Sequence, residues 1–166
     1  MIHVVLYEPE IPQNTGNIMR TCVATNSKLH LIEPLGFKMD DKTIKRCGVN
    51  YINNCDYQIY HNFDEFKSKN PGTYYYFTRY GKKPPTEFEF KDKDIYLIFG
   101  KESTGIPKEI LSQDLSHCMR FPMTDKVRAL NLSNCVAIAV YEVLRQNNYF
   151  DLLRTEPFKG EDYLEN

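Results

Sequence analysis

Short apolar runs alternate along this chain with segments of helical periodicity, and this alternation constrains the fold more than any other feature. The runs at 2–7, 73–78 and 95–99 are apolar or aromatic almost throughout and have no polar face. Strands of this kind are typical of a parallel sheet whose two faces are both covered. We therefore predict an α/β fold with a mostly parallel sheet that helices cover on both faces.

Proline, glycine and asparagine mark where the predicted elements begin and end. Strands are predicted at residues 2–7, 29–32, 57–60, 73–78, 95–99 and 117–121. Helices are predicted at residues 17–26, 40–46, 63–69, 107–113 and 131–147, and Gly48 closes the second of them. The segment 82–93 is polar, contains two consecutive prolines and is expected to form an exposed loop.

Length and composition indicate one small domain without metal or disulfides. The 166 residues can bury a core of their own, and no repeat or linker divides them. We expect a single domain over 1–150 and a C-terminal tail over 151–166. The five cysteines form no C-x-x-C pair, which favours reduced thiols over a metal site. The first apolar run is shorter than a signal sequence or a membrane span, so we expect a soluble cytoplasmic protein.

The charged residues nearly balance, with 21 Lys and Arg against 22 Asp and Glu. This balance is mild evidence against nucleic acid as the partner, because an RNA substrate would require basic side chains gathered on one face. Two local clusters of basic residues meet that requirement: Lys38, Lys42, Lys45 and Arg46 form one, and Arg79, Lys82 and Lys83 form the other. Each cluster is either a solvated face or a patch that contacts RNA backbone.

Three loops follow predicted strands, at the edge of the sheet where open α/β folds bind their ligands. The first loop, 9–17, ends in Asn14, Thr15 and Gly16, directly before a predicted helix. These residues either cap the helix or present free backbone amides to a phosphate or carboxylate.

The second loop, 99–107, runs from an apolar strand into a helix that starts with proline. Gly100 and Gly105 have the spacing of a P-loop, but Ile106 and Pro107 stand where that motif requires Lys and Ser or Thr. A G-x-G-x-x-G dinucleotide motif is absent from the chain. The loop therefore either lines a pocket with backbone amides or is a plain turn between strand and helix.

The third loop, 120–134, combines basic residues, two asparagines and a serine at the start of the last helix. Taken alone, it is a capped helix with solvated charges. The helix that follows has a wider apolar stripe than a lone surface helix needs, which indicates core packing and allows a dimer seam. The four histidines lie in or beside predicted strands, and no G-x-S-x-G nucleophile motif occurs. We expect these histidines to be packed or surface residues and not catalytic bases.

Together, the three loops resemble the motifs of the SPOUT (SpoU–TrmD) methyltransferases, most of all the small single-domain branch that methylates the wobble-nucleotide ribose of tRNA. The matching segments are LYEPEIPQNTGNIMR at 6–20, LIEPLGF at 31–37, LIFGKESTGIP at 97–107 and RFPMTDKVRALNLSN at 120–134. The resemblance covers roughly residues 1–150. It implies a C-terminal deep trefoil knot, S-adenosylmethionine as methyl donor, and a homodimer that packs the first and last helices across its interface.

The resemblance also implies roles for individual residues. Cofactor binding is assigned to Phe77, Thr78, Gly100, Glu102, Gly105, Phe121, Ala129 and Leu130. Catalysis is assigned to Arg20, Asn14, Glu102, Ser133 and Asn134. Contacts to the RNA substrate are assigned to Arg128, Asn131, Lys42, Arg46 and Arg79. Two positions depart from the family pattern: Ala129 replaces a common serine and leaves only backbone contact, and Lys101 replaces a common proline with a charge of open role.

The chemistry of methyl transfer narrows two of these roles. The positive charge on sulfur disappears as the methyl group moves, so a carboxylate on the sulfonium would stabilise the ground state more than the transition state. We therefore interpret Glu102 as a loop organiser or hydrogen-bond acceptor. A guanidinium is a poor base, with a pKa above about 12. Either its site lowers the pKa of Arg20 strongly, or Arg20 positions a phosphate and stabilises the forming alkoxide, and we favour the second.

The substrate implied by the resemblance is wobble cytidine or modified wobble uridine in leucine tRNAs, read in the anticodon loop where bases are single-stranded. A rival interpretation is methylation of rRNA by the same fold, although such relatives often have an extra N-terminal RNA-binding domain. A non-enzyme alternative is an RNA-binding module that has lost turnover. The presence of Asn14, Arg20, Glu102 and Asn131 argues against that alternative.

Overall fold

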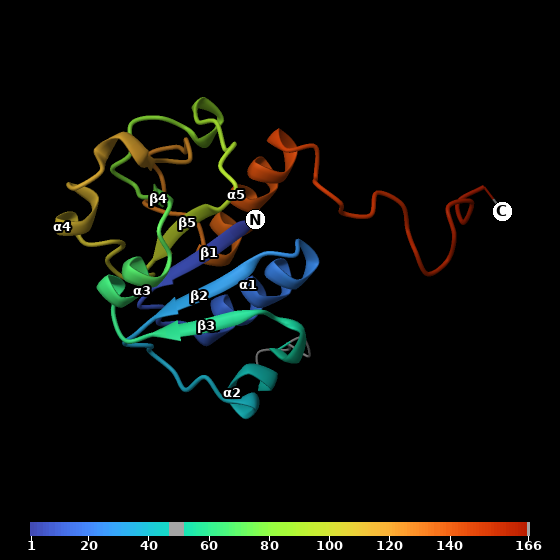
Figure 1. The fold of residues 1–166 in the computed structure, drawn as a ribbon, viewed down its shortest axis with the longest axis horizontal. Helices are drawn as coiled ribbons and strands as arrows, with labels where there is room; N and C mark the ends of the chain where they lie inside the picture. The colour runs from blue at the N-terminus through green and yellow to red at the C-terminus, as the bar shows by residue number, and fades with distance from the viewer. Residues whose placement is uncertain (47–51, 166) are drawn as a thin grey trace.

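The computed structural model describes residues 1–46 and 52–165, which form a parallel β-sheet with helices on both faces (Figure 1). The strands are β1 (Ile2–Tyr7), β2 (Lys28–Ile32), β3 (Tyr57–Tyr60), β4 (Thr73–Phe77), β5 (Ile95–Gly100) and β6 (Cys118–Met119). They lie in the order β3-β2-β1-β5-β4-β6, and every pair is parallel. The helices are α1 (Pro12–Ala24), α2 (Asp41–Arg46), α3 (Phe63–Lys69), α4 (Lys108–Leu111) and α5 (Leu132–Gln146). The predicted α/β class is confirmed.

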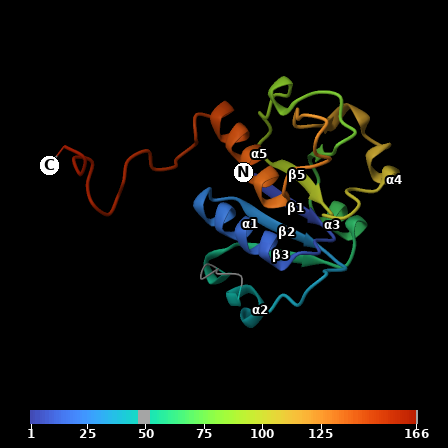
Figure 2. The same cartoon turned by 180° about the vertical axis from the view of Figure 1, so that it is seen from behind.

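Each central strand supplies side chains to two separate cores. In β1, Val4 and Leu6 pack with α1 and α5, whereas Val5 between them packs with α3 and α4. Successive side chains of a strand point to opposite faces, so a strand covered on both faces must be apolar at every position. Figure 2 shows the face that α1 and α5 cover. The continuous apolar runs in the sequence thus have a direct physical cause.

Helix α1 begins five residues earlier than predicted, and this corrects the expected cap. Asn14, Thr15 and Gly16 lie inside the helix and are buried, so they are neither its cap nor an open anion loop. Pro12 occupies the first turn, where its missing N–H would have no helical partner anyway. Gly48, predicted to close the helix 40–46, lies outside the described residues.

The segment 82–93 is only partly the exposed loop that its polarity predicts. Phe90 is 1% exposed and packs on Tyr75 with ring centroids 4.8 Å apart. The side chains of Gln146 and Asn147, at the end of α5, bond the backbone of Phe88 and Phe90 at 2.9–3.1 Å. The segment is therefore fastened to the core by its aromatic residues and to α5 by amide side chains.

The predicted strand 117–121 is shorter in the structure, where β6 contains only Cys118 and Met119. The backbone changes partner after Met119, because the N–H of Arg120 donates to the carbonyl of Lys83 at 3.0 Å. The residues before Cys118 form a turn of 3₁₀ helix, Leu115–His117. None of the helices in the described ranges is both long and apolar enough to cross a membrane.

Candidate functional site

A cavity of about 730 Å³ opens at the C-terminal ends of β4 and β5, where parallel sheets bind ligands. Its wall contains most of the residues singled out in the sequence: Asn14, Phe77, Thr78, Arg79, Gly100, Glu102, Gly105, Phe121, Arg128, Ala129, Leu130 and Asn131. The cavity therefore collects all of the predicted cofactor-binding residues. Five other predicted site residues do not line it: Arg20, Lys42, Arg46, Ser133 and Asn134.

Three phenylalanines from different parts of the chain form one wall of the cavity. Phe77 at the end of β4 stacks on Phe99 of β5, with ring centroids 4.5 Å apart and an interplanar angle of 16°. The ring centroid of Phe121, which follows β6, lies 5.3 Å from that of Phe77 on the same wall. A flat apolar wall of this kind suits a planar ring system in a ligand.

Two glycines shape the 100–105 loop, and one of them leaves its backbone accessible. Gly100 has φ +96°, and a Cβ there would lie 2.6 Å from the carbonyl oxygen of Tyr7, so no other residue fits. Gly105 has φ +75°, and a Cβ there would meet no atom within 4 Å. The amide of Gly105 donates to the carbonyl of Lys101 at 2.9 Å, which closes the loop on itself. The packing against Tyr7 explains why residue 100 is glycine, and the open space at Gly105 lets a ligand approach the main chain closely.

Glu102 reaches from this loop to the start of α1. Its carboxylate accepts hydrogen bonds from the backbone N–H groups of Glu10, at 2.9 Å, and Ile11, at 3.1 Å. The Nδ2 group of Asn14 adds a longer bond at 3.4 Å. A helix N-terminus has unpaired N–H groups and a positive dipole end, so an anionic acceptor there is stabilising. Glu102 is the cap that α1 lacks in its own sequence.

Hydrogen bonds of asparagine side chains connect α1 to α5. The Nδ2 group of Asn131 donates to Oδ1 of Asn14 at 3.0 Å. Oδ1 of Asn131 accepts the backbone N–H groups of Ser133 and Asn134, at 2.9 and 3.3 Å, and the hydroxyl of Ser133 at 2.6 Å. Asn131 is therefore the N-cap of α5, and the link Glu102–Asn14–Asn131 joins all three predicted loops.

Lys101 is engaged with the first loop. Its Nζ lies 2.6 Å from Oε2 of Glu8, and this hydrogen bond raises the pKa of the lysine. Ser103 makes a parallel contact, donating to Oε1 of Glu10 at 2.6 Å. Because Tyr7 pairs with Gly100 in the sheet, the residues that follow the two strands face each other. Sequence reasoning assigned no role to Glu8, Glu10 or Ser103, since the strand order that brings them together is not visible in the sequence.

The rim of the cavity is positively charged. Arg79, Arg120 and Arg128 lie on its wall, and the only carboxylate among the described lining residues is Glu102, which α1 already engages. No histidine is found among those residues either. His30 is fully buried elsewhere in the sheet, and burial lowers its pKa to about 3. The rim is therefore suited to an anionic ligand such as a phosphate.

The cavity also contains one thiol, which the sequence analysis did not assign to the site. Cys135 of α5 lines the wall, and burial raises its pKa to about 11. The thiolate is the nucleophilic form of cysteine, so this side chain stays neutral and unreactive near neutral pH.

The remaining predicted residues lie on helix surfaces. Arg20 is exposed on α1, six residues after Asn14, which places it about 9 Å further along the helix axis and about 120° around it. Lys42 and Arg46 are exposed on α2, beyond β3 in Figure 1 and away from the cavity. Within one chain, these three basic residues therefore lie outside the cavity.

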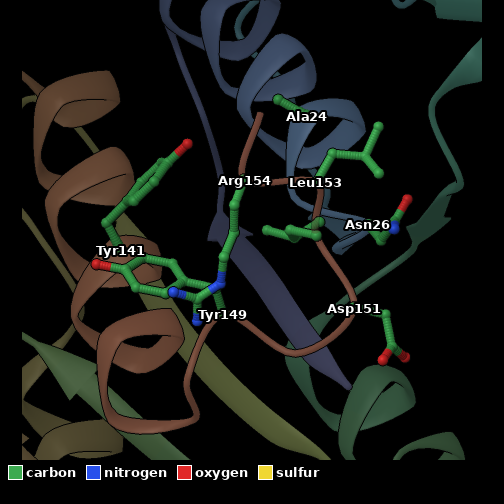
Figure 3. A pocket seen from close by; sticks show the side chains of 8 residues that line it. Ala24, Asn26, Tyr141, Tyr149, Asp151, Leu153 and Arg154 are labelled. Atoms are coloured by element: carbon green, nitrogen blue, oxygen red, sulfur yellow. The ribbon is translucent and has the colours of Figure 1, made fainter. Parts of the chain in front are cut away.

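A second cavity, of about 570 Å³, lies at the other end of α1 (Figure 3). Tyr141 of α5, Tyr149 and Arg154 are among its lining residues. The Arg154 guanidinium lies 5.3 Å from the ring centroid of Tyr149 and bonds the carbonyl of Asn148 at 3.0 Å. None of the predicted site residues lines this cavity. Within residues 1–46 and 52–165, no three His, Cys, Asp or Glu side chains gather so as to hold a metal ion.

Comparison with known proteins connects this geometry to a family. The model of the SpoU rRNA Methylase family matches residues 1–141. A relative from Geobacillus stearothermophilus is 52% identical over 154 residues, covering 91% of this chain and 98% of the relative. The tRNA (cytidine(34)-2′-O)-methyltransferase of Escherichia coli strain K12 is 41% identical over 151 residues, covering 90% and 96%. A solved structure concerned with the 2-OH methylation of C/U34 on tRNA has TM-score 0.81 and 40% identity, covering 89% and 97%.

Proposed function

This chain belongs to the SpoU rRNA Methylase family, and from that premise we propose that it transfers a methyl group from S-adenosylmethionine to a ribose 2′-hydroxyl of tRNA. The observation that carries the proposal is the link Glu102–Asn14–Asn131, which assembles three distant motifs around one cavity. The wobble position is supported by the name of the Escherichia coli relative and by the structure concerned with C/U34. We extend the proposal to the anticodon loop of leucine tRNAs and to the cytoplasm.

The cavity fits S-adenosylmethionine in size and chemistry. Its volume of about 730 Å³ lies within the range of small-molecule sites. Phe77 and Phe121 would contact the adenine ring, with the buried Phe99 stacked behind Phe77. The backbone at Gly100 and Gly105 would approach the rest of the cofactor. Thr78, Ala129 and Leu130 complete the proposed binding set. When bound, the cofactor supplies an electrophilic methyl group on a sulfonium.

Glu102 serves the structure of the site in this proposal and does not neutralise the sulfonium. Both carboxylate oxygens are engaged by donors of α1 and the residues before it. The positive charge at sulfur therefore stays uncompensated by this residue, which favours its loss in the transition state. Asn14 and Asn131 hold the starts of α1 and α5 at the cavity, and Ser133 and Asn134 belong to the capped first turn of α5.

The RNA contacts belong to the positive rim. Arg79 and Arg128 would bind phosphates on either side of the target ribose, with Lys42 and Arg46 as a more distant backbone contact. Arg20 would lie near the 2′-oxygen and stabilise the negative charge that develops there. Because Arg20 does not line the cavity of its own chain, this role needs a second subunit.

We therefore propose a homodimer that packs α1 and α5 across its interface. Two large apolar residues on the outer stripe of α5 support it: Ile138 is 48% exposed and Tyr141 is 51% exposed. In this arrangement the partner's Arg20 completes the site. The proposal further includes a single domain over 1–150 with a separate tail, and a C-terminal segment threaded into a trefoil knot.

The decisive experiment measures transfer of labelled methyl from S-adenosylmethionine to total tRNA and, separately, to rRNA, with the modified nucleotide mapped. Label on a wobble ribose of tRNA is the expected result. The family model is named for rRNA, so label on rRNA alone would keep the chemistry and overturn the tRNA substrate. Tight cofactor binding without label on either RNA would favour a binding module that has lost turnover.

A further inference from the structure

Tyr80 is a large aromatic side chain placed in solvent at the mouth of the cavity. It lines the cavity and is 71% exposed. A single exposed aromatic residue is ordinary on a protein surface and needs no explanation by itself. The backbone around Tyr80, however, is held in place by contacts on several sides.

Tyr80 lies in a tight turn that three hydrogen bonds hold. The N–H of Gly81 donates to the carbonyl of Thr78 at 3.2 Å, and the N–H of Tyr80 donates to the Thr78 hydroxyl at 3.3 Å. Arg120 reaches across and donates to the carbonyl of Arg79 at 2.7 Å. A rigid turn presents its side chain with little ordering cost on binding.

The turn is also pressed against the edge of the sheet. A Cβ at Gly81 would lie 2.4 Å from the carbonyl carbon of Met119, so the backbone approaches β6 as closely as it can. The N–H of Thr78 donates to the carbonyl of Met119 at 2.9 Å. The position of Tyr80 relative to the cofactor cavity is thus set by the sheet.

A cation covers one face of the ring. The guanidinium of Arg79 lies over Tyr80, 5.3 Å from the ring centroid. No other aromatic ring of the described part of the chain packs on Tyr80. An aromatic ring beside a guanidinium is the combination that binds single-stranded RNA, because the ring stacks on a base while the cation meets the phosphate.

Resting on the proposed function, we infer that Tyr80 is the stacking platform for a nucleobase within one nucleotide of the methylated ribose. Thr78, two residues earlier, belongs to the proposed cofactor set, so a base on Tyr80 lies next to the reacting centre. Stacking does not distinguish one base from another, because every base has a π-face. Tyr80 is therefore a positioning residue that holds the nucleotide segment and leaves base identity to other contacts.

The test compares kcat/KM for the same tRNA in Tyr80→Ala, Tyr80→Phe and the wild-type protein. Loss of one stacked base costs about 1–3 kcal/mol, so kcat/KM for tRNA falls by about 5- to 150-fold in Tyr80→Ala. Tyr80→Phe keeps the ring, so its kcat/KM stays within about 2-fold of the wild-type value. The Kd for S-adenosylmethionine is unchanged in both variants. A weakened cofactor Kd would show that Tyr80 stacks on the cofactor and would overturn the inference.

Tyr163→Ala is a matched control. Tyr163 is 59% exposed in the C-terminal tail and has Lys159 over its ring at 4.7 Å, yet it lies outside the cavity. We expect its kcat/KM to equal that of the wild type. A loss of kcat/KM equal to that of Tyr80→Ala would mean that any exposed aromatic side chain contributes by nonspecific contact with RNA, and it would overturn the inference.

A crosslinking readout separates failure of this inference from failure of the proposed function. An anticodon stem-loop with 5-iodouridine at the wobble position or its neighbour is irradiated with the protein, and the crosslinked peptide is sequenced. We expect the crosslink on Tyr80, lost in Tyr80→Ala. A crosslink elsewhere overturns the inference even if methylation occurs. A crosslink on Tyr80, together with no label on tRNA or rRNA in the methyl-transfer assay above, upholds the stacking of a base at the cavity and refutes the enzyme activity alone.

Discussion

Replacing Glu102 with glutamine tests whether the carboxylate holds the start of α1. In the structure, one oxygen accepts the N–H of Glu10, and the other accepts the N–H of Ile11 and the amide of Asn14. Glutamine has one acceptor oxygen and places an NH₂ group at the other position. At best, the glutamine oxygen keeps the hydrogen bonds of one carboxylate oxygen. At the position of the other oxygen, the NH₂ group would face a backbone N–H, and two donors cannot bond each other.

The expected cost follows from these contacts. An unsatisfied, partly buried N–H costs about 1–3 kcal/mol. Loss of a negative charge at a helix N-terminus costs about 0.3–1 kcal/mol more. We therefore expect Glu102→Gln to lower the free energy of unfolding by about 1–4 kcal/mol, which lowers Tm by about 3–16 °C for a chain of this size.

The assay is urea and thermal unfolding followed by circular dichroism, with calorimetry of S-adenosylmethionine binding. Glu109→Gln is the matched control, because Glu109 is exposed on α4 and its carboxylate accepts no hydrogen bond from a backbone N–H of residues 1–46 and 52–165. We expect the control to change stability by less than about 0.5 kcal/mol. If Glu102→Gln keeps full stability and loses cofactor affinity, the carboxylate acts on the sulfonium and our reasoning about its role is refuted.

Asn131→Ala removes the cap of α5 and the bond to Asn14, so the free energy of unfolding falls by about 1–2 kcal/mol in urea titrations, non-additively with Asn14→Ala. Burial lowers the pKa of His30 from its ordinary 6.5 to about 3, so the unfolded chain takes up the proton first as pH falls. Stability from this group is present above pH 6.5 and falls by about 1 kcal/mol between pH 6.5 and 5.5. The variant His30→Gln makes this slope smaller, and His3, whose pKa burial also lowers, contributes the remainder. Arg128→Ala lowers the slope of log K for tRNA binding against log salt by about 1, measured by anisotropy.

Distinct results would contradict each of these. If the stability losses of Asn14→Ala and Asn131→Ala were strictly additive, the hydrogen bond between these two side chains would contribute nothing to stability. Equal unfolding free energies at pH 6.5 and 5.5 would mean that the His30 ring accepts a proton in the folded state. An unchanged salt slope for Arg128→Ala would place that guanidinium away from the phosphates.

The sequence by itself determined the class of fold and most strand positions. The strands at 2–7 and 57–60 were predicted with the bounds that the structure has. The first is a continuous apolar run because both of its faces are buried. The second is the edge strand β3, and its two central residues are exposed. The collection of the 9–17, 99–107 and 120–134 loops at one edge also followed from the sequence, since parallel strands share a direction. These properties depend on residues close together along the chain, where periodicity and turn residues are informative.

The sequence analysis interpreted Glu102 as a loop organiser or hydrogen-bond acceptor, in agreement with its contacts. Only the tertiary structure decided where α1 begins, which donors Glu102 accepts from and what Lys101 contacts. The cap of α1 comes from a residue 91 positions or more away along the chain, so no local pattern near Pro12 could reveal it. The bond between Asn14 and Asn131 spans 117 positions. Such contacts exist because β1 and β5 are neighbours in the sheet, an order that depends on the packing of the whole chain. The physical reason is that capping and ion pairing need proximity in space, whereas a sequence records only proximity along the backbone.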